Sequence, residues 1–166
     1  MELNNKKINF LGDSITEGAC LEDWNNVYWM RLGRETGATV RGYGIGGTRF
    51  AVQLHRSAEL RWDQDFCSRV ADMDPDADVV VVFGGTNDYG HGDAPFGTKE
   101  DATPATYMGA VRFLMNFLTT EFAGKPIVFL TPARRNGDED VYTLRQAGNS
   151  HARALLPYVD AIHEIA

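Results

Sequence analysis

Four consecutive valines followed by a phenylalanine, at residues 79–83, constrain the fold of this chain more than any other feature. β-Branched and aromatic residues favour strands, and a run without a polar position indicates a strand that is buried on both faces. Such strands are typical of parallel sheets, in which helical crossovers cover both sides. The run is followed by Gly-Gly-Thr-Asn-Asp at residues 84–88, so the strand is expected to end there.

Apolar segments of this kind alternate along the chain with segments of helical periodicity. Strands are expected at residues 6–13, 38–43, 78–83 and 125–132. Helices are expected at residues 24–36, near 50–54, near 66–73, from about 103 to 122, and in the segment that ends at 166. This alternation predicts βαβ units and a parallel sheet with helices on both faces. The 166 residues contain no internal repeat or linker, so one domain over residues 1–166 is expected.

Composition and charge argue against several classes of function. A net charge of −7 and a pI near 5.0 disfavour nucleic acid or an anionic membrane as a partner, because both require a basic surface. No apolar run approaches the roughly 18 residues of a membrane span, and no signal peptide precedes the first strand. Cys20 and Cys67 form neither a disulfide framework nor a metal-binding cluster, although their pairing is left open. A cytoplasmic protein is therefore expected.

Three strands of the predicted sheet end in polar, glycine-rich sequence. These are Gly-Asp-Ser at residues 12–14, Gly-Ile-Gly-Gly at 44–47, and Gly-Gly-Thr-Asn-Asp at 84–88. We expect them to lie together, because the carboxyl ends of parallel strands meet at one edge of a sheet. Ser14 would then be placed as a nucleophile, and the Gly47 N–H and the Asn87 side-chain amide as donors to an oxyanion. Taken alone, Gly-Asp-Ser is equally consistent with an ordinary turn.

The three motifs, in this order, resemble those of the SGNH (GDSL-type) hydrolases, with Ile15 where the family has leucine. The resemblance implies a flavodoxin-like three-layer α/β/α sandwich with a parallel sheet. It also implies a carboxylic-ester hydrolase that acts on small acyl esters, often those of carbohydrates, without a metal or organic cofactor. It casts Ser14 as the nucleophile, with the Ser14 N–H, Gly47 and Asn87 forming the oxyanion hole.

The family also uses a general base, a histidine in an Asp-x-x-His motif near the C-terminus. Asp160 and His163 match this spacing, but apolar residues recur at helical spacing over residues 155–166. This pattern favours an amphipathic helix with a solvated Asp and His. A fifth strand and a loop carrying the base are not recognised. The domain is therefore expected to be C-terminally incomplete, with four strands, the base beyond residue 166, and an uncovered sheet edge that favours a homo-oligomer.

The remaining histidines are weaker candidates for the base. His91 follows the third strand and so belongs to the expected catalytic edge, where it would shape the substrate pocket, act as the base, or be a plain loop residue. His55 and His151 have no carboxylate at a telling sequence spacing, and a surface role is favoured for both.

Two rival functions are left open. Residues 42–47 have the Gly-x-Gly-x-x-Gly spacing of a dinucleotide-binding loop, but they follow the second strand, and Asp63 and Asp65 follow no strand that would present them to a ribose. The other rival is a non-catalytic module that binds an acylated ligand without hydrolysing it, which the unrecognised base motivates.

Overall fold

The computed structural model describes residues 2–134 and 155–166. The strands in this part of the chain are β1 (Lys7–Gly12), β2 (Thr39–Gly44), β3 (Val79–Phe83) and β4 (Ile127–Leu130). The α-helices are α1 (Ser14–Glu17), α2 (Tyr28–Thr36), α3 (Phe66–Arg69), α4 (Thr86–His91), α5 (Tyr107–Glu121) and α6 (Leu155–Ile165). Short 3₁₀ turns lie at η1 (Trp24–Asn26), η2 (Leu60–Asp63) and η3 (Val70–Asp72).

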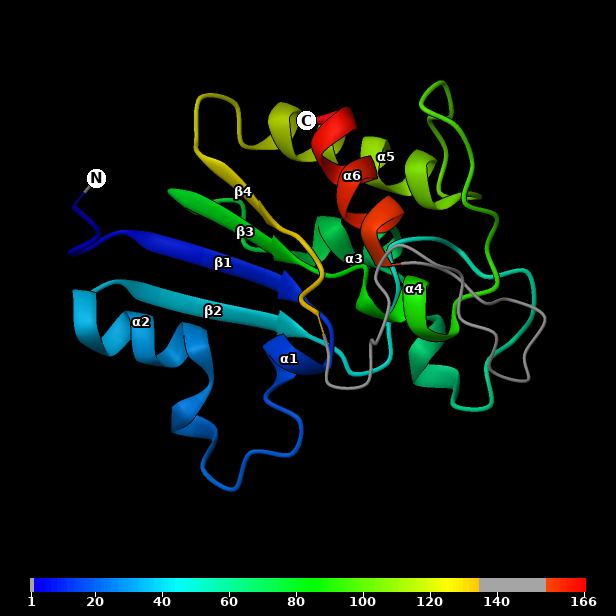
Figure 1. Ribbon diagram of the computed structural model, residues 1–166. Helices are drawn as coiled ribbons and strands as arrows, with labels where there is room; N and C mark the ends of the chain where they lie inside the picture. Colours follow the sequence, from blue (N-terminus) through cyan, green and yellow to red (C-terminus); the bar gives the residue numbers. More distant parts are fainter. Residues whose placement is uncertain (1, 135–154) are drawn as a thin grey trace.

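The strands form one parallel sheet in the order β2-β1-β3-β4 (Figure 1). In its register, Phe10 of β1 lies opposite Gly42 of β2 and Val81 of β3. The four strands observed lie within the four expected segments or one residue beyond them. All the carboxyl ends therefore point the same way, toward α1 and α4.

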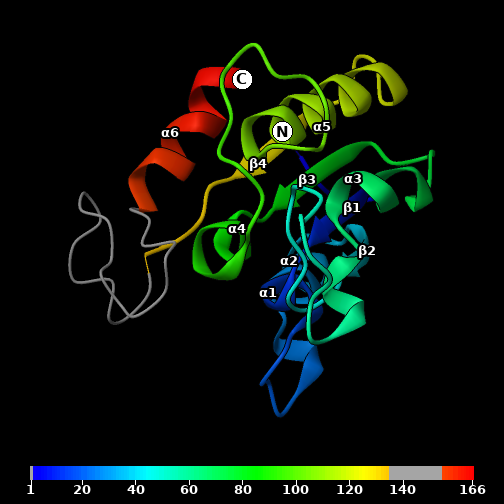
Figure 2. The same ribbon diagram turned by 90° about the vertical axis from the view of Figure 1, so that its right-hand side faces the viewer.

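Helices cover both faces of this sheet, because successive residues of its strands point to opposite sides. Leu11, Val80 and Val82 pack into the larger apolar core, together with residues of α3, α5 and α6. Ile8 and Phe10 pack into a second core with Trp29 of α2 on the other face. Figures 1 and 2 both show α6 beside α5. The arrangement is a three-layer α/β/α sandwich, so the fold class predicted from the sequence is confirmed.

The helix expected near residues 50–54 is wrong. The backbone N–H groups of Phe50 and Ala51 donate to the Asp88 carboxylate at 2.9 and 3.1 Å, and that of Val52 donates to the Pro104 carbonyl at 2.9 Å. These partners come from distant parts of the chain. The Leu54 N–H, which a helix over residues 50–54 would direct to the Phe50 carbonyl, donates to Asp93 at 2.8 Å instead, so this segment follows the neighbouring elements.

Two other helices differ from expectation at their starts. α5 begins after Thr106, whose hydroxyl accepts from the Gly109 N–H at 3.1 Å, and not at the Thr103–Pro104 pair. The segment 24–36 is divided at Val27, which has an extended backbone between η1 and α2. The start of α5 is set by its side-chain cap, and the start of α2 by the extended residue before it. The spacing of apolar residues does not reveal either boundary.

A close approach between α1 and the end of β2 sets the geometry of the carboxyl edge of the sheet. A Cβ at Gly44 would lie 2.2 Å from the Glu17 nitrogen, so only glycine fits there. This contact lets α1 fold back against the sheet directly after β1, which keeps Ser14 at the edge.

Within the described residues β4 is an edge strand, and its Val128 and Leu130 are exposed. A groove of about 360 Å³ runs beside it, between β4, α5 and α6. An uncovered edge was expected from the sequence. That the domain is C-terminally incomplete, and that this edge mediates association, stay predictions.

Candidate active site

Ser14 is the first residue of α1, immediately after β1. Asp13 caps this helix, with its Oδ1 atom accepting a hydrogen bond from the Ile15 N–H at 3.0 Å. The helix ends after one turn at Gly18, which has a left-handed backbone. Ser14 is half-buried, and its Cβ lies 3.6 Å from the position that a Cβ on Gly46 would take. The serine thus lies against the loop that follows β2.

The loop after β2 is held in place from two sides. The carboxylate of Glu17 accepts a hydrogen bond from the Gly46 N–H at 2.8 Å and also pairs with Arg61. Gly47 has a φ of +79°, and a Cβ at this position would lie 2.1 Å from Cδ1 of Trp62. The indole of Trp62 therefore covers Gly47 so closely that no side chain fits beneath it.

Asn87 approaches the same loop from α4. Its side chain is buried, and its Nδ2 atom donates to the Thr48 carbonyl oxygen at 2.9 Å. The loop at residues 46–48 therefore lies beside Ser14 at one end and is hydrogen-bonded to Asn87 at the other. The structure brings together the three strand ends that the sequence singled out, whereas the roles of Ser14, Gly47 and Asn87 in catalysis stay predictions.

A buried arginine that sequence reasoning missed lies beneath this loop. The guanidinium of Arg69 donates to the carbonyl oxygens of Gly12 and Tyr43 at 2.7 and 2.6 Å, and to the Thr48 hydroxyl at 3.0 Å. It thereby ties the ends of β1 and β2 to the loop. Burial lowers the pKa of Arg69 to about 10, which leaves it cationic at neutral pH. The sequence does not distinguish it from an exposed arginine, since the predicted helix around it also contains Ser68 and Asp72.

Two carboxyl groups are buried next to the candidate site residues. Burial raises the pKa of Asp13 to about 6, although the Ile15 N–H and the Arg69 charge oppose this shift. Burial likewise raises the pKa of Asp88 to about 6, against the hydrogen bonds that it accepts from Phe50 and Ala51. Each carboxyl fixes local backbone, Asp13 as a helix cap and Asp88 as an anchor between α4 and the chain after the loop.

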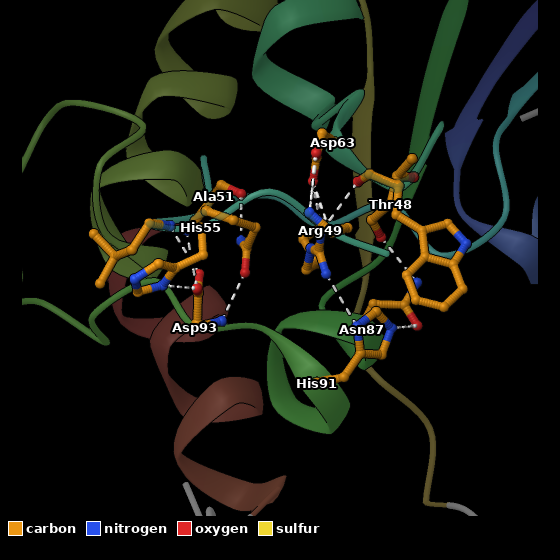
Figure 3. Close-up of polar contacts among 12 residues, drawn as sticks. Thr48, Arg49, Ala51, His55, Asp63, Asn87, His91 and Asp93 are labelled. Carbon is orange, nitrogen blue, oxygen red and sulfur yellow. Dashed lines mark hydrogen bonds and ion pairs between the residues drawn. The ribbon is translucent and has the colours of Figure 1, made fainter. Parts of the chain in front are cut away.

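His91 lies in the last turn of α4 and contacts Asn87, as Figure 3 shows. Its Nε2 atom is 3.2 Å from Asn87 Oδ1, and its Nδ1 atom is 3.0 Å from a terminal nitrogen of Arg49. The Arg49 side chain is buried and also donates to the Trp62 carbonyl and to Asp63, both at 3.3 Å. The sequence placed His91 at the correct edge but gave no sign of Arg49.

The other histidines are placed less favourably for a base. His55 is exposed, and its Nδ1 atom pairs with Asp93 at 2.9 Å, on the opposite side of Arg49 from His91 in Figure 3. His163 is exposed on α6 and lines the groove that contains Ile127, the first residue of β4. This groove lies along β4, which β3 separates from β1, the strand that Ser14 follows. His151 lies outside the described residues.

The helix expected at the C-terminal end of the sequence is present as α6 and is amphipathic, as the apolar spacing indicated. Its buried residues are Leu155, Tyr158, Ala161 and Ile162, whereas Asp160 and His163 are exposed. The pair therefore occupies the solvated face of a packed helix, as expected from the sequence.

The structure gives no support to a dinucleotide site at residues 42–47. Gly42 and Gly44 belong to strand β2, so they form no phosphate-binding turn. Asp63 accepts from the Ser57 hydroxyl, and Asp65 caps α3, so both carboxylates already have structural partners.

No group of three or more His, Cys, Asp or Glu residues within 2–134 and 155–166 is arranged to hold a metal. Cys20 is exposed and Cys67 is buried, and both are free thiols, so the pairing left open by the sequence is not formed.

The sequence matches the profile of the GDSL-like lipase/acylhydrolase family over residues 10–165. The chain belongs to this family. Among curated proteins, none matches the sequence. None of the described helices combines the length and the apolar run that are needed to cross a bilayer. The cytoplasmic location expected from the sequence stays a prediction.

Solved structures share the fold of this GDSL-family chain. A protein from Lactobacillus plantarum is 26% identical with a TM-score of 0.72, over 98% of this chain and 72% of that one. A candidate GDSL-like lipase from Bacteroides uniformis is 19% identical with a TM-score of 0.67, over 96% and 94%. An acetyl xylan esterase is 22% identical with a TM-score of 0.55, over 96% and 72%. The last two likenesses show the fold alone.

Proposed function

We propose that this GDSL-family protein is a serine esterase that hydrolyses small acyl esters, including those of carbohydrates, through an acyl-serine intermediate. The observation that carries the proposal is the meeting of Ser14, the loop at residues 46–48 and Asn87 at the carboxyl edge of the sheet. Membership of the family supports hydrolase activity. The acetyl xylan esterase of the same fold makes acylated carbohydrates a reasonable first substrate class.

In the proposed reaction, Ser14 Oγ attacks the ester carbonyl carbon and the carbonyl oxygen becomes an oxyanion. Ser14 is the first residue of α1, where a backbone N–H has no partner within the helix and is available to a ligand. The Gly47 N–H and the Asn87 amide are the other two proposed donors. Collapse of the tetrahedral intermediate expels the alcohol and leaves an acyl-serine, which water then hydrolyses.

The Ser14 proton requires a base. His91 has contacts at both ring nitrogens, His55 pairs with Asp93, and His163 lines the groove beside β4, which β3 separates from β1. We therefore assign the base to none of these three residues. The location of the base beyond residue 166 stays a prediction.

Hydrolysis of short-chain p-nitrophenyl esters tests the proposed function. We expect Ser14→Ala to abolish turnover, while Ser68→Ala, at an exposed serine of α3, retains it. A fluorophosphonate should label Ser14, as peptide mass analysis would show. Unchanged turnover in Ser14→Ala would exclude this serine as the nucleophile. A folded wild-type protein that binds acylated sugars but neither hydrolyses esters nor reacts with the probe would favour the non-catalytic module.

A further inference from the structure

We propose that Arg49 and His91 form a hydrogen-bond relay that holds the Asn87 amide in the orientation needed to donate to the oxyanion. In this relay His91 is a neutral positioning residue and not the general base. The inference rests on the proposed esterase function, and it explains why an arginine is buried beside the loop that carries Gly47.

The chemistry of the two ends fixes the direction of every hydrogen bond in the relay. A guanidinium can only donate, so His91 Nδ1 must accept from Arg49 and carries no proton. A carbonyl oxygen can only accept, so the Thr48 end must receive a proton from the Asn87 amide nitrogen. Between them, His91 Nε2 carries the proton and donates to Asn87 Oδ1. No other assignment of protons satisfies all three contacts.

This direction determines what Asn87 offers to a substrate. The Oδ1 atom is occupied by His91, and one Nδ2 hydrogen is occupied by the Thr48 carbonyl. The second Nδ2 hydrogen is the group left to donate to the oxyanion. If the Asn87 amide rotated by 180°, its Oδ1 atom would face the oxyanion instead, and these two negatively polarised oxygens would repel each other. A terminal amide torsion has broad, roughly two-fold freedom, so the orientation must be imposed from outside.

The start of the relay is well anchored. The side chain of Arg49 is only 4% exposed, and the Ser57 hydroxyl, the Trp62 carbonyl and Asp63 also accept its hydrogen bonds. The Trp62 ring lies 5.2 Å from the His91 ring and also covers Gly47. Through Trp62 the cluster also contacts the loop that carries Gly47. It therefore positions Asn87 and Gly47, two of the proposed oxyanion donors, relative to each other.

The same contacts make His91 unsuitable as the base for Ser14. Accepting a proton at Nδ1 would place an imidazolium N–H against the Arg49 guanidinium, which has no lone pair to receive it. The contact would then be repulsive, and the restraint on Asn87 would be lost.

A double-mutant cycle on ester hydrolysis tests the relay. Removing one oxyanion donor typically lowers kcat by about 10²–10³-fold, and we expect Asn87→Ala to fall in this range. His91→Ala should lower kcat by about 10-fold or more, as a partial loss of the same donor, with KM changed by less than about two-fold. In the Asn87→Ala background, His91→Ala should have little further effect, because the proposed relay acts on the reaction through Asn87.

Rescue separates positioning from a merely structural role. His91→Gln keeps an acceptor and a donor that are bonded to the same carbon, as the two imidazole nitrogens are, so it should recover much of the kcat lost in His91→Ala. His55→Ala is the control for loss of an exposed imidazole. The relay would be overturned if the reductions in kcat caused by His91→Ala and by Asn87→Ala simply multiplied in the double variant. It would also be overturned if His91→Ala left kcat unchanged while hydrolysis still required Ser14. Unchanged hydrolysis in Ser14→Ala would instead refute the proposed function.

A measurement without substrate tests the relay even if ester hydrolysis is not found. In ¹⁵N NMR of the wild-type protein at pH 8, the imidazole nitrogens of His91 should show the proton on Nε2 and none on Nδ1. The opposite tautomer, or rapid averaging between the two, would overturn the proposed direction of the relay.

Discussion

The side-chain amide of Asn87 donates to the carbonyl oxygen of Thr48 at 2.9 Å, so one hydrogen bond joins the loop after β2 to the helix after β3. Two strand ends that lie about 40 residues apart in the sequence are thereby fixed to each other. Ser14, which follows the end of β1, completes the arrangement. The relative position of the proposed catalytic groups thus depends on a few contacts around residues 46–48.

We expect substitution of Asn87 to affect turnover much more than stability. Asn87→Ala should lower kcat on p-nitrophenyl acetate by about 10²–10³-fold, as loss of an oxyanion donor does elsewhere. Loss of its hydrogen bond to Thr48 should cost only about 1 kcal/mol of unfolding free energy. Steady-state kinetics together with urea denaturation separate the two effects. A variant with a raised KM and an unchanged kcat would show that Asn87 binds substrate and not the oxyanion.

Gly47 should tolerate no side chain. Gly47→Ala would place a residue with a Cβ at a φ of +79° and 2.1 Å from Trp62, so the loop or the indole must move. We expect a stability loss beyond the cost of about 1 kcal/mol for a left-handed alanine, together with a fall in kcat. Gly124→Ala is the matched control, since Gly124 also has a positive φ, of +74°, but no atom within 4 Å of the added carbon. Equal stability losses in the two variants would show that Trp62 yields without cost.

How much of this site the sequence predicted depends on what each residue contacts. Buried strands can be predicted because burial on both faces favours runs of apolar residues such as consecutive valines. The proximity of the motifs at the ends of the strands then follows from the parallel topology. Ser14, Gly47 and Asn87 could be found in this way. Arg49 and Arg69 could not, because a buried arginine and an exposed one look alike in a sequence until its acceptors are known. The failed helix near residues 50–54 has the same origin, since the backbone donors of Phe50, Ala51 and Leu54 go to Asp88 and Asp93, 37 to 39 residues away.

The buried carboxyl of Asp13 should make stability depend on pH. Its pKa is raised from 3.8 to about 6, so the folded protein binds this proton more tightly than the unfolded chain. The contribution of Asp13 to the free energy of unfolding is therefore largest below about pH 4 and is lost as the pH rises through 6, a change of about 3 kcal/mol for a shift of this size. Asp88 should contribute in the same direction, because its pKa is also raised to about 6.

Asp13→Asn isolates the contribution of Asp13. Asparagine keeps the cap to Ile15 and carries no charge, and the Oδ2 atom that it replaces has no hydrogen-bond partner in the described part of the chain. We expect the variant to exceed the wild type in stability at pH 7 and to lose this advantage near pH 4. Urea denaturation across this range checks the difference, with exposed Asp160→Asn as the control. A constant difference at every pH would show that the effect is not electrostatic.

The Asp160–His163 pair matches the spacing of the family's base motif, yet its position argues against that role. Both side chains are exposed on α6, and His163 lines the groove beside β4, whereas Ser14 follows β1, which β3 separates from β4. A base must come within hydrogen-bond reach of the serine proton. We therefore expect Asp160→Ala and His163→Ala to retain wild-type kcat and KM to within about two-fold, because neither residue can contact the reacting atoms. A loss of kcat comparable to that of Ser14→Ala, in a variant with unchanged thermal unfolding, would instead require α6 to leave its place on α5 during catalysis.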